Sequence, residues 1–186
     1  MDLLGMVFNI VINLATLLIF LRFIMQLSAV DPYNPVVMST FQATRIVDVF
    51  NRILPVKAGG RLNIAALVLL VLLALISIAG NHLLNGVPPP PPLELVFMVL
   101  FEMVQQLLSF CRILLIASII LSWVVAFTQS QSPYIGVVMQ LSEPLLAPFR
   151  RILPDTGPLD LSPVVAFLAI YICEQLVANA AAVVLP

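Results

Sequence analysis

Charged residues are scarce in this chain of 186 residues, in which Asp, Glu, Lys and Arg together make up 9%. Soluble domains carry about 25% charged residues. Apolar residues make up 62%, so the chain cannot cover a water-facing surface with polar groups. The net charge of −1 gives no overall field that would attract nucleic acid. These shortages exclude a soluble enzyme, a disordered tail and a small disulfide-stabilised domain, and they predict an integral membrane protein.

The residues that bind metals or carry covalent chemistry are also few. There are two cysteines, Cys111 and Cys173, and one histidine, His82, which is distant in sequence from both. A metal site needs three or four convergent ligands, and nucleophilic catalysis needs a nucleophile beside a base. Neither pattern is present, so we expect buried structural thiols, no cofactor, no metal and no enzymatic activity.

Four apolar stretches are long enough to cross a bilayer, which takes about 20 helical residues. They cover residues 3–29, 62–79, 93–127 and 161–185. The first is not a secretory signal peptide, because it lacks a basic start and carries Arg22 late in the apolar run. The third is too long for one upright span and should tilt or begin at the interface. The predicted fold class is an all-α integral membrane protein with four transmembrane helices.

Basic residues outside these stretches lie in two connecting segments. Those between the first two spans are Arg45, Arg52, Lys57 and Arg61, and those between the last two are Arg150 and Arg151. The positive-inside rule makes both segments cytoplasmic. The termini and the Pro-rich linker, which have no Lys or Arg, are then expected outside.

The five consecutive prolines at 88–92 divide the chain into two halves. We expect a first unit over 1–80, a linker over 81–92 and a second unit over 93–186. Polyproline II geometry, at about 3.1 Å per residue, makes the linker a stiff spacer, and a PxxP ligand for SH3-like domains is the less favoured interpretation.

The two halves share a pattern of short motifs. Residues Leu17–Arg22, Pro32-Tyr33 and Arg52–Pro55 correspond to Leu107–Arg112, Pro133-Tyr134 and Arg151–Pro154. Each half has an even number of spans, so both should have the same orientation. This predicts parallel repeats related by an axis near the membrane normal.

The most specific motif is SEPLLAPFRRILP at 142–154, followed by LDLSP at 159–163. With the preceding Arg and Pro-Tyr, it resembles the YggT family of YlmG-like membrane proteins in bacteria and plastids. The motif residues are Glu143, Pro144, Pro148, Pro154, Asp160 and Pro163. In the first half, Thr44, Val49 and Asn63 replace Glu143, Pro148 and Asp160. A role tied to the motif is therefore expected in the second half.

The resemblance implies two YggT-like units in a small multispanning protein of the bacterial inner membrane. It also implies a link to osmotic stress, cell division or the assembly of membrane complexes, without an agreed biochemical activity.

Each cytoplasmic segment contains an amphipathic helical pattern. Its apolar positions are Ala43, Ile46, Val47, Phe50, Ile53 and Leu54 in the first half, and Val138, Leu141, Leu145, Phe149 and Ile152 in the second. Such helices lie in the membrane interface. The simpler interpretation is an anchor that sets topology. The functional interpretation is a docking surface for anionic lipid or a cytoplasmic partner, formed by the six basic residues of these segments.

Charged residues inside spans need a partner or a cavity. At 1.5 Å per residue, Arg112 and Glu174 lie about 22 Å and 20 Å from the cytoplasmic face of adjacent spans. We therefore predict that they form an ion pair within the membrane. Arg22 lies about eight residues from the cytoplasmic end of its span, so it is expected to snorkel to the interface.

Uncharged polar residues and Glu102 mark faces on three spans. They are Asn9, Asn13 and Thr16 on the first span, Glu102, Gln105, Gln106 and Ser109 on the third, and Gln175 and Asn179 on the fourth. Interhelical hydrogen bonding is the commoner role of such residues, and a water-filled path is the alternative.

Two function hypotheses follow. The first is a non-enzymatic scaffold or assembly factor that binds anionic lipids and a membrane-complex partner protein through its cytoplasmic loops. The second is a component of a transporter or channel for ions or small solutes, lined by Arg112, Glu174 and the amides. Homo-oligomers through the small residues Ala178, Ala181 and Ala182 would suit either hypothesis. No nucleic-acid partner is expected.

Overall fold

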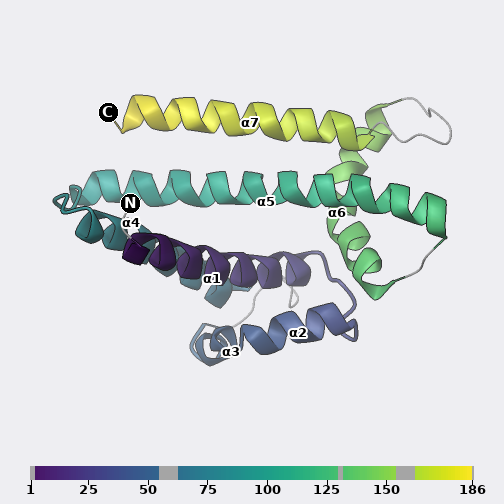
Figure 1. The fold of residues 1–186 in the computed structure, drawn as a ribbon, viewed down its shortest axis with the longest axis horizontal. Helices are drawn as coiled ribbons and strands as arrows, with labels where there is room; N and C mark the ends of the chain where they lie inside the picture. Colours follow the sequence, from purple (N-terminus) through teal and green to yellow (C-terminus); the bar gives the residue numbers. More distant parts are fainter. Residues whose placement is uncertain (1–2, 55–62, 130–131, 154–161, 186) are drawn as a thin grey trace.

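The computed structural model describes residues 3–54, 63–129, 132–153 and 162–185. Over these ranges the chain forms seven helices and no strand (Figure 1). The helices are α1 (Leu3–Leu27), α2 (Pro35–Ala43), α3 (Ile46–Asn51), α4 (Ile64–Leu84), α5 (Pro92–Thr128), α6 (Pro133–Ile152) and α7 (Ser162–Val184).

Four of these helices, α1, α4, α5 and α7, are long and apolar enough to cross a membrane. They match the four predicted stretches, with one clear difference in extent. The second stretch was expected to end at 79, but α4 continues to Leu84, so part of the predicted linker is helical. A tertiary contact accounts for the additional helical residues, because Asn81 at this end of α4 pairs with Asn9 of α1.

The long third stretch forms a single helix of 37 residues. At 1.5 Å per residue it is about 55 Å long, which exceeds the hydrocarbon thickness of about 30 Å. Figure 1 shows α5 between α7 and the α1–α4 pair, with its C-terminal end extending past the neighbouring ends of α1 and α7. This end exposes Trp123 and Phe127, whose side chains contact little of the protein.

Apolar side chains join the two halves at their centre. Phe20 of α1 meets Phe110 of α5 edge to face, with ring centroids 4.9 Å apart. Nearer α2 and α6, Met25 and Val37 pack in one cluster with Leu114 and Leu141. The halves are therefore in direct contact, and the Pro-rich linker does not hold them apart.

The two amphipathic segments fold differently. The first forms two short helices, α2 and α3, because the helix is interrupted at Thr44. The Thr44 carbonyl oxygen accepts a hydrogen bond from Arg22. The second forms the single helix α6, and neither Pro144 nor Pro148 ends it. In Figure 1, α6 crosses α5 toward the start of α7, whereas α2 runs back along α1.

The thiols are less enclosed than the sequence suggested. Cys111 is half-buried, and Cys173 is exposed on α7. The expectation of buried thiols is wrong for Cys173, because a residue of a transmembrane helix can face lipid without meeting water.

Asn63 fixes the start of α4 against the end of α1. Its side chain is fully buried, accepts the Ala66 N–H at 2.9 Å as the helix N-cap, and donates to Gln26 Oε1 at 2.8 Å. The cap satisfies a backbone donor at the helix start, and the second contact ties the two spans together.

We predict that Asn63→Ala lowers the free energy of unfolding by about 1 kcal/mol or more, because the cap is lost and the Gln26 amide is left without its partner. Asn63→Asp keeps the cap acceptor, and the Gln26 amide can rotate to donate to it, so its loss should be smaller. Thermal or denaturant unfolding in detergent measures both, with Ser39→Ala on the exposed face of α2 as control. Equal losses for Ala and Asp would contradict the capping role.

Candidate functional site

Among the ion-paired side chains of the described residues, that of Arg22 is the most deeply buried. Its side chain is 3% exposed and pairs with the carboxylate of Asp48 in α3. Its Nη1 donates to the Thr44 carbonyl oxygen at 2.8 Å, and the guanidinium lies 4.6 Å from the centre of the Phe41 ring. The expectation that Arg22 snorkels to the headgroups is therefore wrong: protein groups meet its charge. A residue of α1 thus holds α2 and α3 in place.

Arg112 of α5 and Glu174 of α7 lie together between these two closely packed helices. Arg112 Nε is 3.2 Å from Glu174 Oε1, although the N–H is not aligned for a hydrogen bond. The Glu174 side chain is 6% exposed and that of Arg112 is 36% exposed. The contact is therefore an electrostatic pair whose anion is buried and whose cation reaches the protein surface.

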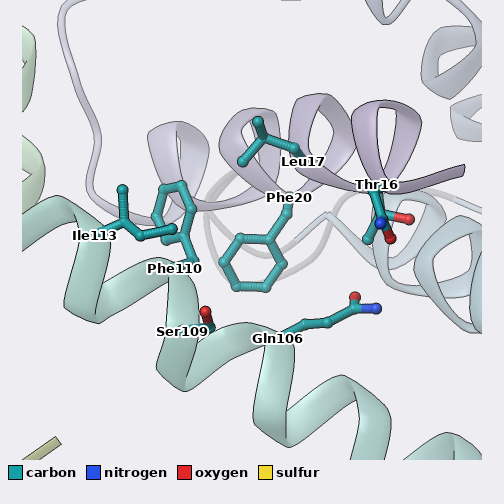
Figure 2. Close-up of a pocket in the computed structure, with 8 residues that line it drawn as sticks. Thr16, Leu17, Phe20, Gln106, Ser109, Phe110 and Ile113 are labelled. Carbon is teal, nitrogen blue, oxygen red and sulfur yellow. The ribbon is translucent and has the colours of Figure 1, made fainter. Parts of the chain in front are cut away.

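A groove of about 150 Å³ lies between α1 and α5. Four polar and four apolar residues line it, namely Asn13, Thr16, Gln106, Ser109, Leu17, Phe20, Phe110 and Ile113. Figure 2 shows the Gln106 amide extending toward Thr16, while the two aromatic rings fill the other side. The groove does not include Arg112 or Glu174. The polar residues expected on one face of the third span therefore lie at two separate sites, with Gln106 and Ser109 in the groove and Arg112 beside Glu174.

The remaining polar residues of the spans are mostly used in pairs. Asn9 and Asn81 exchange two hydrogen bonds of 3.0 and 3.1 Å between α1 and α4. Thr16 donates to the Ile12 carbonyl oxygen within its own helix. Asn9, Asn13 and Thr16 therefore do not act as one face. Glu102 accepts from Gln106 and has Ser77 of α4 as a further hydrogen-bond partner, whereas the buried Gln105 Oε1 has none among the described residues.

The described basic residues between the spans are at the surface. Arg45, Arg52 and Arg151 are exposed, and Arg150 pairs with the motif residue Glu143 at 2.6 Å. Pro163 lies in the first turn of α7, where proline is tolerated. Lys57, Arg61, Pro154 and Asp160 lie outside the described residues.

Sequence reasoning missed Asp48, Phe41 and Asn81 as partners. Asp48 lies 19 residues beyond the predicted end of the first span at residue 29, and no local pattern connects it with Arg22. Counting residues from the ends of two neighbouring spans predicts that Arg112 and Glu174 lie at the same depth. It does not predict that the segment after α1 turns back toward Arg22.

Comparison with known proteins decides the family. A family model described as CCB3/YggT matches residues 97–181. The uncharacterised protein YggT of Escherichia coli K12 is 32% identical over 180 residues, which cover 96% of this chain and 91% of that protein. The chain belongs to the CCB3/YggT family. An uncharacterised protein of Pseudomonas aeruginosa is 36% identical over 169 residues, which cover 90% of this chain and 84% of that protein.

Membership in the CCB3/YggT family confirms the resemblance seen in the motifs, and the matched residues fall in the second half, where the motifs are complete. An uncharacterised protein of Haemophilus influenzae is 34% identical over 163 residues, which cover 87% of this chain and 84% of that protein. The names of these relatives assign no activity. No solved structure matches the chain.

For the Arg112–Glu174 pair we predict that Arg112→Gln and Glu174→Gln each lower stability in detergent, because each leaves one charge in the bilayer without its partner. The double variant should lose less than the sum of the two.

A double-mutant cycle of unfolding free energies in detergent measures the coupling. Leu176→Val, on the exposed side of α7, is the matched control. Strictly additive losses would show that the pair contributes no coupling.

Proposed function

We propose that the protein is a non-enzymatic membrane scaffold of the bacterial inner membrane, active in assembly or stress response. In this proposal, its cytoplasmic segments bind anionic lipid and present a fixed surface to a membrane-complex partner. The observation that carries it is the Arg22 contact, in which a transmembrane helix holds an amphipathic segment by a buried charge. A passive anchor would not need a contact of this kind, since apolar insertion alone holds an interfacial helix.

The distribution of exposed charge supports the same proposal. Arg45 and Arg52 flank α3, and Arg151 lies in the last turn of α6. Each basic side chain near an anionic leaflet contributes about 1 kcal/mol of attraction. Their segments are held by the spans, so the attraction acts on surfaces of defined position.

The proposed orientation places the termini and the linker outside. Figure 1 shows both ends of the chain and the α4–α5 connection at one end of the molecule, and α2, α3 and α6 away from that end. Four of the six basic residues outside the spans lie in the described part of the chain, and all four belong to the second group, in accord with the positive-inside rule: Arg45, Arg52, Arg150 and Arg151. We also infer that 1–80 and 93–186 are parallel repeats, which the paired motifs support.

A role in transport is the alternative proposal, and the groove between α1 and α5 favours it. Its volume of about 150 Å³ is small for a ligand site, since such pockets hold about 300–1,000 Å³. The charged pair of the spans also lies apart from it. These features make passage of a solute the weaker of the two proposals.

The orientation is tested by cysteine labelling in a background with Cys111 and Cys173 replaced by Ala. Single cysteines at the exposed positions Ser39 and Gln140 should resist an impermeant thiol reagent added to intact spheroplasts, and one at Asn85 should react. Permeabilisation should make all three react. The opposite pattern would remove the cytoplasmic docking surface from the proposal.

Lipid binding is tested with the double variant Arg150→Gln, Arg151→Gln. Phosphatidylglycerol added to the purified protein in neutral detergent should raise its Tm more than phosphatidylcholine does. The difference should fall in the double variant and at high salt, since attraction between exposed charges is screened within about 10 Å at 0.1 M. Gln140→Ala on the same helix is the uncharged control. An equal Tm rise in wild type and double variant, at every salt concentration, would leave anchoring as the sole role of α6.

A further inference from the structure

The side of α7 that faces away from the rest of the protein carries two amides. Gln175 and Asn179 are both exposed, and neither has a hydrogen-bond partner among the described residues. Gln175 lies nine residues from the end of α7, at Val184, or about 14 Å at 1.5 Å per residue, which places it deep in the hydrocarbon. Lipid tails cannot hydrogen-bond to an amide, so this face lacks the partner that its depth requires.

The amides belong to a regular stripe. Leu168, Ile172, Gln175, Asn179 and Ala182 are all exposed and follow one another at spacings of four and three residues. This is the spacing at which two helices pack side by side in a left-handed pair. Ala166 and Glu174 are buried on the other side of α7, which packs on α5 and α6. The stripe is therefore separate from the contacts that hold the fold together.

We propose that this stripe binds a second copy of the chain, so that two α7 helices associate in parallel across a two-fold axis along the membrane normal. The inference goes beyond the scaffold proposal and does not depend on lipid binding. Two copies in one membrane share one orientation, so each amide meets its counterpart at the same depth without any other matching partner. An amide both donates and accepts, and is therefore its own complement.

The fold already contains a contact of this type. Asn9 and Asn81 exchange two hydrogen bonds of 3.0 and 3.1 Å between neighbouring spans. Small side chains in and beside the stripe allow the close approach that such bonds need, since Ala182 and the neighbouring Ala178 are exposed. Ala181, which the sequence grouped with them, is half-buried toward the rest of the protein and does not belong to the stripe.

Disulfide crosslinking in native membranes tests the position of the contact. In the background lacking Cys111 and Cys173, single cysteines at Leu168, Ile172 and Ala182 should form covalent dimers under mild oxidation. Ala180→Cys is the matched control, because it is exposed at similar depth but lies off the stripe. Crosslinking at Ala180 equal to that at Ala182, or crosslinks at Ala182 only to a different protein, would overturn the proposal.

Energy transfer between two differently labelled populations in liposomes tests the role of the amides. Gln175→Leu with Asn179→Leu should weaken association about sevenfold, the equivalent of two interhelical hydrogen bonds. The thermal stability of the protein in detergent should stay unchanged, since neither amide has an internal partner. Unchanged association in the double variant would overturn the amide contact even if crosslinks form.

Discussion

The absence of water in the hydrocarbon layer is the constraint on which this structure depends. A polar side chain placed there must find its partner in the protein. Three contacts provide such partners. They join α1 to α4 through Asn9 and Asn81, α5 to α7 through Arg112 and Glu174, and α1 to α3 through Arg22 and Asp48. Apolar packing brings the helices together, and these contacts specify which faces meet.

The two arginines of the spans show that depth selects the partner. Arg22 lies five residues before the end of α1, and the segment that follows α1 returns to it. Arg112 lies 16 residues, or about 24 Å, before the end of α5, and its partner comes from another long helix, α7. The two arginines therefore meet partners on elements of different kinds.

The sequence predicts the features that depend only on position along the chain. Apolar runs locate the four spans within a few residues, and counting along two neighbouring spans brings Arg112 and Glu174 to the same depth. The sequence does not predict which side chains meet where this depends on the rotation of a helix about its axis or on the path of a connecting segment. Asn81 was expected at the start of the linker, and Asp48 lies in a segment for which the sequence predicts only an amphipathic pattern. Both are defined by residues more than 20 positions away, which local patterns do not encode.

The distribution of satisfied and unsatisfied polar groups bears on function. A path for solutes needs polar groups that are available to water along the interior of the protein. Here the interior charges are paired, and the amides of α1 and α4 bind each other. Further polar groups lie on outer surfaces: Arg45, Arg52 and Arg151 of the segments between the spans, and the amides Gln175 and Asn179 of α7. Because these groups face outward, they support the proposals of recognition at the surface over passage through the centre.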